Sequence, residues 1–235
     1  MSVSVEFVGH ACFRIWEDGR PRLVTDPFRF ETLKIADTGY RLDAETVVVS
    51  SLTDDAHDNV GLVHGSPQVI NALDVARGTS KVEFGGEPIV TIEAAEDPNH
   101  TMHSPSDNAL YALRIGGLWF AHMGDLGYQL TAEQLAPFAG RCDALFALTG
   151  EQFTPTHEQL DPMIEFLQPR WIFPMHYNIP PVSFEMTKIE DFVSHRAEDP
   201  AVFVRHHTVE LPLAAPRSGR PTIVVLDPSG YQRTG

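Results

Sequence analysis

The stretch Val47-Val48-Val49-Ser50-Ser51-Leu52-Thr53-Asp54-Asp55-Ala56-His57-Asp58 joins a run of β-branched residues to a polar loop. Three consecutive valines predict a buried strand, and the Ser, Asp and His residues that follow mark its end. Carboxylates and imidazoles placed directly after a strand are the side chains that bind metal ions or carry acid–base chemistry. The function of the protein therefore depends on whether this loop binds a metal.

The first half of the chain contains short runs of β-branched and aromatic residues, separated by Gly, Pro and Asp. We expect strands at Val3 to Val8, Cys12 to Trp16, Arg22 to Thr25, Thr46 to Ser50, Lys81 to Phe84 and Ile89 to Glu93. A helix is expected between Ser66 and Gly78, because Ser66 is a suitable N-cap, Pro67 suits the first helical position and Gly78 terminates.

The second half alternates strands with helices. The expected strands are Ala109 to Arg114, Leu118 to Ala121, Ala144 to Leu148, Trp171 to Pro174 and Thr222 to Leu226. The expected helices are Ala132 to Phe138, His157 to Leu167 and Phe184 to Arg196. Strand pairs followed by strand–helix units, repeated in two halves, predict an α/β fold with two facing sheets and helices outside, the αββα sandwich. We expect a single domain spanning residues 1–235, since no repeat or linker interrupts the chain.

Five further segments, in a fixed order, carry a family resemblance: Phe7 to Phe13, Leu23 to Phe28, Asn108 to Tyr111, Gly117 to Gly127 and Ile172 to Tyr177. Together with the Asp/His loop they resemble the metallo-β-lactamase superfamily, in the branch that includes L-ascorbate 6-phosphate lactonase and related metal-dependent hydrolases. The resemblance implies the metallo-β-lactamase-like fold and a hydrolase that activates water with metal ions.

In that superfamily the loop carries His-x-His-x-Asp-His, which supplies ligands to two metals. Without a gap, its three histidines fall on Ser51, Thr53 and Ala56, and its aspartate falls on Asp55. Three of the four ligands are therefore absent, and the motif is degenerate. His57 comes one residue late, and a shift of one residue in the loop would let it take the role lost at Ala56.

The later ligands carry over more directly. Asp125 matches the bridging carboxylate of the superfamily, and His176 matches its last histidine. The place of the remaining histidine stays open among His103, His100, Glu96 and Asp97.

The resemblance thus implies a rearranged site for one divalent metal, zinc or manganese. The expected metal ligands are Asp55, His57, His103, Asp125 and His176. The expected catalytic residues are Asp55, His57 and Asp125. His10 and Asp26, in the opening hairpin, are expected to contact the substrate.

Three hypotheses follow for the function. The first is a hydrolase of a small phosphorylated or lactone-like substrate that uses metal-activated water. The second is a metal-free pseudoenzyme or small-molecule binding protein, in which Asp125 and His176 remain as a hydrogen-bonded pair. The third is a metal-independent enzyme with His57 or His103 as general acid or base, since a neutral imidazole serves near pH 7.

Composition narrows the partners and the compartment. The formal charge of -15 repels nucleic acid and anionic membranes, so a small-molecule substrate is the expected partner. The two cysteines, Cys12 and Cys142, lie far apart in the sequence and form no CxxC pair, which argues against a disulfide framework. No segment approaches the ~20 apolar residues of a membrane span, and the first residues lack a basic, apolar leader. We therefore expect a cytoplasmic protein.

Overall fold

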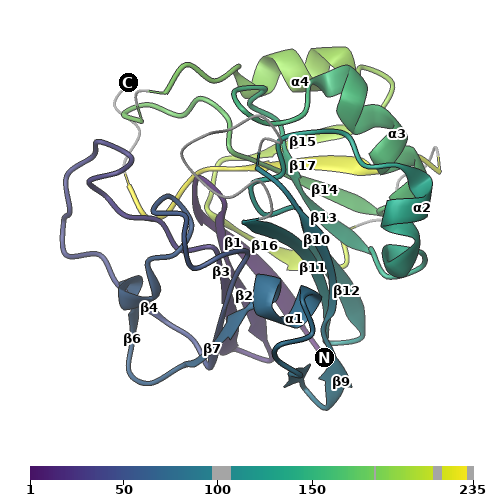
Figure 1. The fold of residues 1–235 in the computed structure, drawn as a ribbon. Helices are drawn as coiled ribbons and strands as arrows, with labels where there is room; N and C mark the ends of the chain where they lie inside the picture. Colours follow the sequence, from purple (N-terminus) through teal and green to yellow (C-terminus); the bar gives the residue numbers. More distant parts are fainter. Residues whose placement is uncertain (97–106, 183, 214–218, 232–235) are drawn as a thin grey trace.

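The computed structural model describes residues 1–96, 107–182, 184–213 and 219–231. Two β-sheets form the centre, and α2, α3 and α4 lie along one outer side of the molecule (Figure 1). This arrangement confirms the expected α/β fold with facing sheets. Among the described residues, no helix is long and apolar enough to cross a lipid bilayer.

The first sheet has the strand order β16-β1-β2-β3-β5-β7. Its strands are β1 (Val3–Gly9), β2 (Cys12–Glu17), β3 (Arg20–Thr25), β5 (Thr46–Val49), β7 (Gln68–Asn71) and β16 (Thr208–Leu211). The pairs β1–β2 and β2–β3 are antiparallel, whereas β5 runs parallel to β3 and to β7.

The second sheet has the order β10-β11-β12-β13-β14-β17-β15. Its strands are β10 (Val90–Ala94), β11 (Asn108–Ile115), β12 (Leu118–His122), β13 (Ala144–Leu148), β14 (Trp171–Met175), β17 (Thr222–Leu226) and β15 (Ala201–Val204). Neighbouring strands in the part of this order that runs β12-β13-β14-β17-β15 pair in parallel. Parallel pairing requires crossover connections, which leave helices on the outer face.

The helices and small hairpins complete the fold. The helices are α1 (Ala72–Ala76), α2 (Ala132–Leu135), α3 (His157–Leu167) and α4 (Ile189–His195), with 3-10 turns η1 (Val60–Leu62) and η2 (Ala136–Phe138). Two short pairs, β4 (Leu42–Asp43) with β6 (Val63–His64) and β8 (Glu83–Phe84) with β9 (Glu87–Pro88), lie outside the main sheets.

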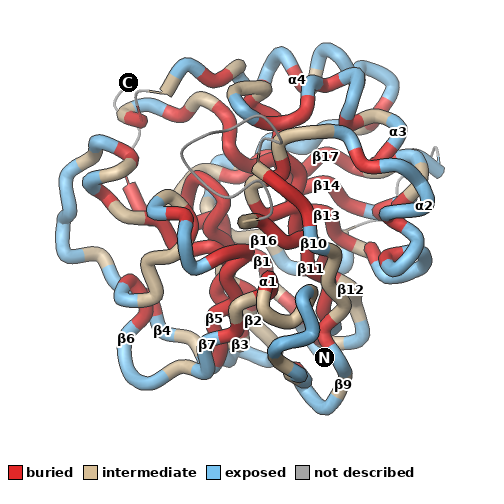
Figure 2. The backbone as a smooth tube through the Cα atoms, in the orientation of Figure 1, coloured by how far each residue is buried: buried red, intermediate tan, exposed pale blue. Residues whose placement is uncertain are grey.

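The core lies between the two sheets, whose strands are mostly buried, while loops and outer helix faces are exposed (Figure 2). Every residue of β5 and of β13 is buried, because each strand is covered on both faces. Phe13 of β2 stacks on Phe146 of β13, with ring centroids 4.2 Å apart, and so joins the two sheets.

This topology brings several strand ends to one edge of the sandwich. The loops after β3 and β5 leave the first sheet there, and the loops after β12 and β14 leave the second. Ends of parallel strands meet at the same edge of a sheet, which is where open α/β sheets present their sites.

Candidate metal centre

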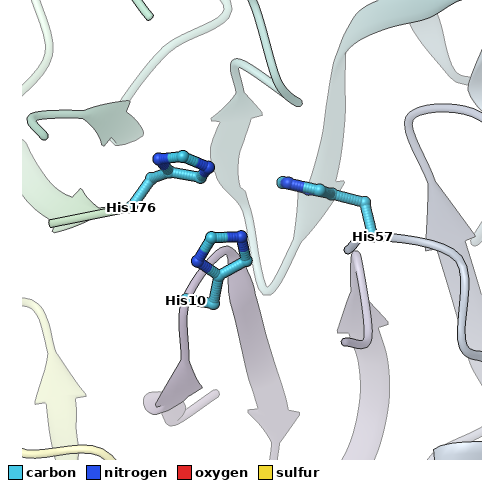
Figure 3. A group of neighbouring side chains, drawn as sticks. All are labelled: His10, His57 and His176. Atoms are coloured by element: carbon cyan, nitrogen blue, oxygen red, sulfur yellow. The ribbon is translucent and has the colours of Figure 1, made fainter. Parts of the chain in front are cut away.

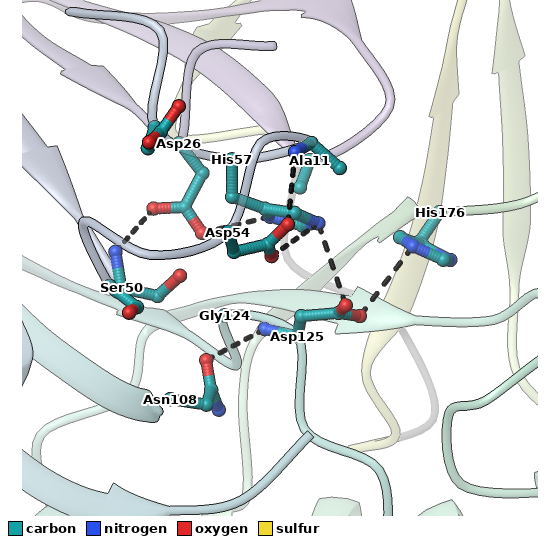
Figure 4. Close-up of polar contacts among 12 residues, drawn as sticks. Ala11, Asp26, Ser50, Asp54, His57, Asn108, Gly124, Asp125 and His176 are labelled. Atoms are coloured by element: carbon teal, nitrogen blue, oxygen red, sulfur yellow. Dashed lines mark hydrogen bonds and ion pairs between the residues drawn. The ribbon is translucent and has the colours of Figure 1, made fainter. Parts of the chain in front are cut away.

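Five polar residues meet at this edge, and each follows a strand or occupies a turn between strands (Figure 4). Asp26 follows β3, His57 lies in the loop after β5, Asp125 follows β12 and His176 follows β14. His10 lies in the β1–β2 turn (Figure 3). Rigid strands on both sheets therefore hold the side chains in place.

The loop after β5 forms a turn that places two possible metal ligands, the side chains of Asp54 and His57, on the same side. The His57 N–H donates to the Asp54 carbonyl at 2.9 Å, and the Ala56 N–H donates to Asp54 Oδ1 at 2.9 Å. The two side chains at the ends of this turn approach each other, with His57 Nε2 3.7 Å from Asp54 Oδ2. The loop thus supplies both a carboxylate and an imidazole to the cluster.

Asp26 anchors His57 from behind. Its Oδ2 lies 3.3 Å from His57 Nδ1, and its Oδ1 accepts from the Ser50 N–H at 2.8 Å and from the Tyr111 hydroxyl at 3.3 Å. Burial works against its negative charge, but His122 and His57 outweigh that effect and lower the pKa of Asp26. An ionised Asp26 accepts a hydrogen bond from the Nδ1–H of His57 and leaves Nε2 directed at the cluster.

Asp125 lies between the two histidines. Its Oδ2 is 3.8 Å from His57 Nε2, and its Oδ1 is 3.5 Å from His176 Nε2. The Asp125 N–H donates to Asn108 Oδ1 at 2.9 Å, which fixes the start of this loop. Gly124 precedes it with φ +60°, and a Cβ there would collide with the Asn108 side chain, so this approach requires glycine.

Three histidines from three separate loops face one another in this cluster (Figure 3). The ring of His10 lies 4.2 Å from that of His176 and 5.0 Å from that of His57, centroid to centroid. The His176 N–H donates to the His10 carbonyl at 2.9 Å, which ties the two loops together.

The backbone at this edge is strained. His10, Asp26 and His176 have φ of 54°, 34° and 55°, in the left-handed region that residues with a Cβ rarely adopt. Such conformations persist only where surrounding contacts impose them, and they concentrate at functional sites. The geometry of this cluster is therefore imposed by the fold.

The electrostatics favour a positive charge at the centre. Burial lowers the pKa of His57, but Asp54, Asp125 and Asp26 outweigh it and raise that pKa to about 10. Burial raises the pKa of Asp125 to about 7, against the attraction of His57. Burial and the charge of His57 lower the pKa of His176 to about 3, so His176 is neutral at pH 7.

Glu96 belongs to the same electrostatic neighbourhood. Burial, followed by repulsion from Asp54 and Asp125, raises its pKa to about 8. Its Oε1 is buried without a hydrogen-bond partner. The carboxyl group of Glu96 therefore keeps its proton at neutral pH in the protein without a metal.

On the opposite side of the loop, the polar side chains form hydrogen bonds with one another and with Asp107. The hydroxyls of Ser51 and Thr53 are 2.8 Å apart, and Thr53 Oγ1 donates to Asp107 Oδ2 at 3.0 Å. Asp107 also lies 3.8 Å from an Arg77 guanidinium nitrogen. These side chains occupy the positions at which the superfamily motif has two histidines, and they satisfy one another.

The placement of Asp55 corrects the sequence-based expectation. Its side chain is 78% exposed and lies 3.5 Å from Arg29 Nε, at the tip of the turn, so Asp54 takes the place expected for it. Asp26 also differs from expectation, because it is 0% exposed and supports His57 from a position that a substrate cannot reach. His57, Asp125 and His176 come together as expected, with His10 beside them. His103, His100 and Asp97 lie outside the described residues.

Sequence reasoning assigned no site role to three residues that belong to this cluster or support it. Asp54 could have been found from the turn, since residues three apart in a turn come close together, which Asp54 and His57 do. Asn108 and Tyr111 lie on β11 and act through Asp125 and Asp26, and no local sequence pattern predicts those contacts.

The donor set fits a divalent cation. Asp54, His57 and Asp125 offer ligand atoms within 4.8 Å of one another, and so do His10, His57 and His176. His57 Nε2, Asp125 Oδ1, His176 Nδ1 and His10 Nε2 are buried without a hydrogen-bond partner. Buried polar atoms are normally paired, so a cluster with several unpaired atoms is suited to binding a ligand. Imidazole and carboxylate together suit a borderline metal such as zinc.

Comparison with known proteins identifies the family. The model of the Beta-lactamase superfamily domain matches residues 4–176, which include every described residue of the cluster. The chain therefore belongs to the metallo-β-lactamase superfamily.

Named relatives and solved structures agree with this assignment. A UPF0173 metal-dependent hydrolase of Thermococcus onnurineus is 26% identical over 220 residues, which cover 83% of this chain and 94% of the relative. A metallo-β-lactamase superfamily structure from Thermotoga maritima has a TM-score of 0.68 at 23% identity, and the match covers 95% of this chain and 98% of that one. Igni18, a metallo hydrolase from Ignicoccus hospitalis, has a TM-score of 0.58 at 17% identity, covering 91% and 100%.

Proposed function

We propose that the protein is a metal-dependent hydrolase whose single divalent cation is held by Asp54, His57, Asp125 and His176. The observation that carries this proposal is the cluster of ligand atoms itself: those of Asp54, His57 and Asp125 lie within 4.8 Å of one another, and His57 Nε2 and Asp125 Oδ1 are buried without a hydrogen-bond partner. Relatives named metal-dependent hydrolases support the same reaction class.

The proposal of one cation rests on the asymmetry of the loop. Ser51 and Thr53 offer hydroxyls that already bond to each other and to Asp107. A neutral hydroxyl is a poor substitute for imidazole as a ligand of zinc or manganese. The second ion common in the superfamily therefore has no counterpart ligands among these residues.

The residues of the chain have distinct tasks in this proposal. A divalent cation supplies Lewis acidity and makes water acidic enough to ionise near neutral pH. Asp26 holds the proton of His57 at Nδ1 and keeps Nε2 available as a ligand atom. Asn108 fixes the backbone of Asp125, and the strained turn at His10 places an imidazole beside His176 where it can contact a substrate.

We further propose a small phosphorylated or lactone-like substrate, as the superfamily resemblance implies. The formal charge of the chain is -15, so an anionic substrate would be repelled except where a cation attracts it locally. Asp54, Asp125 and Glu96 surround the centre with carboxyl groups, which makes that attraction depend on the metal.

The adjacent residues Asp54 and Asp55 give a matched test. Protein purified without a metal-affinity tag is loaded with zinc or manganese and analysed by elemental analysis and by hydrolysis of ester, lactone and phosphate-ester substrates. Asp54→Asn is expected to lose most of the bound metal and the activity, whereas Asp55→Asn keeps both because its side chain is exposed. Activity that survives exhaustive chelation, or equal losses in the two variants, would overturn the proposal.

A further inference from the structure

His122 is a buried histidine next to Asp26, with its Nδ1 3.7 Å from Asp26 Oδ2. It is the last residue of β12, its exposure is 1%, and its ring stacks on that of Tyr111 with centroids 5.0 Å apart. A side chain enclosed in this way cannot reach a substrate. Any part that His122 plays in the chemistry must therefore pass through the groups to which it is bonded.

Both ring nitrogens of His122 have backbone partners. The Gly124 N–H donates to Nδ1 at 2.9 Å, and Nε2 lies 2.9 Å from the Ala11 carbonyl oxygen. A backbone N–H can only donate and a carbonyl oxygen can only accept. Nδ1 is therefore unprotonated and Nε2 carries the proton, which is the neutral imidazole. Burial, which lowers the pKa of His122 against the attraction of Asp26, favours the same neutral form.

The two partners of His122 belong to turns that carry residues of the metal centre. Ala11 follows His10 in the β1–β2 turn of the first sheet, and Gly124 precedes Asp125 in the turn after β12 of the second sheet. One rigid ring is therefore bonded to both turns. It fixes the turn of Asp125 relative to the turn of His10.

The two hydrogen bonds differ in how easily another group replaces them. The Ala11 carbonyl also accepts from the Thr25 hydroxyl at 3.2 Å, so it keeps a partner when Nε2 is removed. Within the described residues, Nδ1 of His122 is the one acceptor of the Gly124 N–H. The turn of Asp125 therefore depends on Nδ1 more than the turn of His10 depends on Nε2.

We propose that His122 is a positioning residue of the metal centre, whose unprotonated Nδ1 holds the Gly124–Asp125 turn so that the Asp125 carboxylate lies between His57 and His176. This inference rests on the proposed function, because the position of Asp125 matters for metal binding only if Asp125 is a ligand. Groups that orient metal ligands change metal affinity about 10–100-fold when they are removed. His122 acts in this way through the backbone of the turn and touches neither metal nor substrate.

Two substitutions at His122 separate its two hydrogen bonds. His122→Asn places an amide oxygen where Nδ1 lies and keeps an acceptor for Gly124, whereas His122→Gln places an amide nitrogen near Nε2 and keeps a donor for Ala11. Calorimetric titration of the metal-free full chain with zinc compares them. We expect His122→Asn to bind zinc nearly as tightly as the wild type and His122→Gln to bind about 10-fold more weakly.

Chemical denaturation of the same proteins without zinc separates positioning from a role in stability. Each variant loses one buried hydrogen bond, so we expect the two to lose similar stability. Zinc affinities that follow the stabilities of the variants, or equal zinc affinities in His122→Asn and His122→Gln, would overturn the proposal and leave the metal-dependent hydrolase intact. A wild type that binds no zinc would overturn both.

Nitrogen NMR of the histidine rings tests the tautomer in the wild type, and therefore applies even if a variant fails to fold. In the metal-free protein we expect His122 to keep a protonated Nε2 and an unprotonated Nδ1 from pH 7 to pH 9. A protonated Nδ1 in this range would overturn the proposal, because that nitrogen could not accept from the Gly124 N–H.

Discussion

The two sides of the loop after β5 differ in how their polar atoms are satisfied. On one side, His57 Nε2 and Asp125 Oδ1 are buried without hydrogen-bond partners. On the other, Ser51, Thr53 and Asp107 bond to one another. Leaving a buried polar atom unpaired costs about 1–3 kcal/mol. A bound ligand would therefore stabilise the first side, whereas the polar groups of the second side, the completed side, already have hydrogen-bond partners. This difference supports the proposal that the loop helps to hold one cation.

We expect the largest effect when the hydroxyl side chains of the completed side, Ser51 and Thr53, are replaced with metal ligands. The double variant Ser51→His with Thr53→His removes the hydroxyl pair and adds two imidazoles near Asp107. We expect the number of zinc ions bound per chain, measured by elemental analysis and zinc titration, to rise from one toward two. Thr53→His alone is the control and is expected to leave the stoichiometry at one. A double variant that folds and still binds one ion would show that the backbone path, rather than the missing histidines, excludes a second ion.

The second prediction tests the unpaired side of the loop by removing the carboxylate that accepts a hydrogen bond from His57. Asp26→Asn keeps the size of the side chain but no longer accepts the Nδ1 proton as a carboxylate. We expect the affinity for zinc to fall about 10–100-fold, with binding restored at high zinc concentration. Calorimetric titration measures the change. An unchanged affinity would mean that Asp26 serves only to hold Ser50 and Tyr111 in the core.

The pH dependence of metal binding follows from the raised pKa of His57. Asp54 and Asp125 raise that pKa to about 10 in the protein without metal, so a cation must displace a proton from His57 below that pH. The apparent affinity is therefore expected to rise about tenfold per pH unit between pH 7 and pH 10. Below about pH 7 the rise is steeper, because Asp125 also holds a proton there.

Zinc titrations in buffers of different ionisation enthalpy check this proton release directly. A metal affinity that does not change between pH 7 and 9 would contradict the protonated state of His57.

The sequence predicted most of the fold because its strands are short, apolar and bounded by turn residues. Helix α3 (His157–Leu167) forms at the expected residues, since Thr156 and Gln159 make a capping box. The helix expected from Ser66 begins only at Ala72, because Gln68–Asn71 forms β7 beside β5 and its pairing overrides the local capping signal. Strands β15 and β16 were not expected, since both are short and one is exposed.

The site was predicted less completely than the fold. The order of motifs placed Asp125 and His176 where the structure has them, because each follows a buried strand. The gapless motif pointed to Asp55, but the loop turns so that Asp54 and His57 face inward. Contacts between the ends of neighbouring strands, such as Asn108 with Asp125, depend on the tertiary fold and have no local sequence signal.

The smallest expected effect concerns the completed side alone. Thr53→Val removes the hydroxyl that joins Ser51 to Asp107, while keeping the shape of the side chain. We expect the free energy of unfolding to fall by about 1 kcal/mol, because Ser51 loses a partner in a buried position and Asp107 regains water. Chemical denaturation measures this change, and Thr53→Ser is the control that keeps the hydroxyl. Zinc affinity is expected to stay the same in both variants, since these hydroxyls are committed to each other. A loss of zinc affinity in Thr53→Val that Thr53→Ser restores would mean that both sides of the loop help to hold the cation.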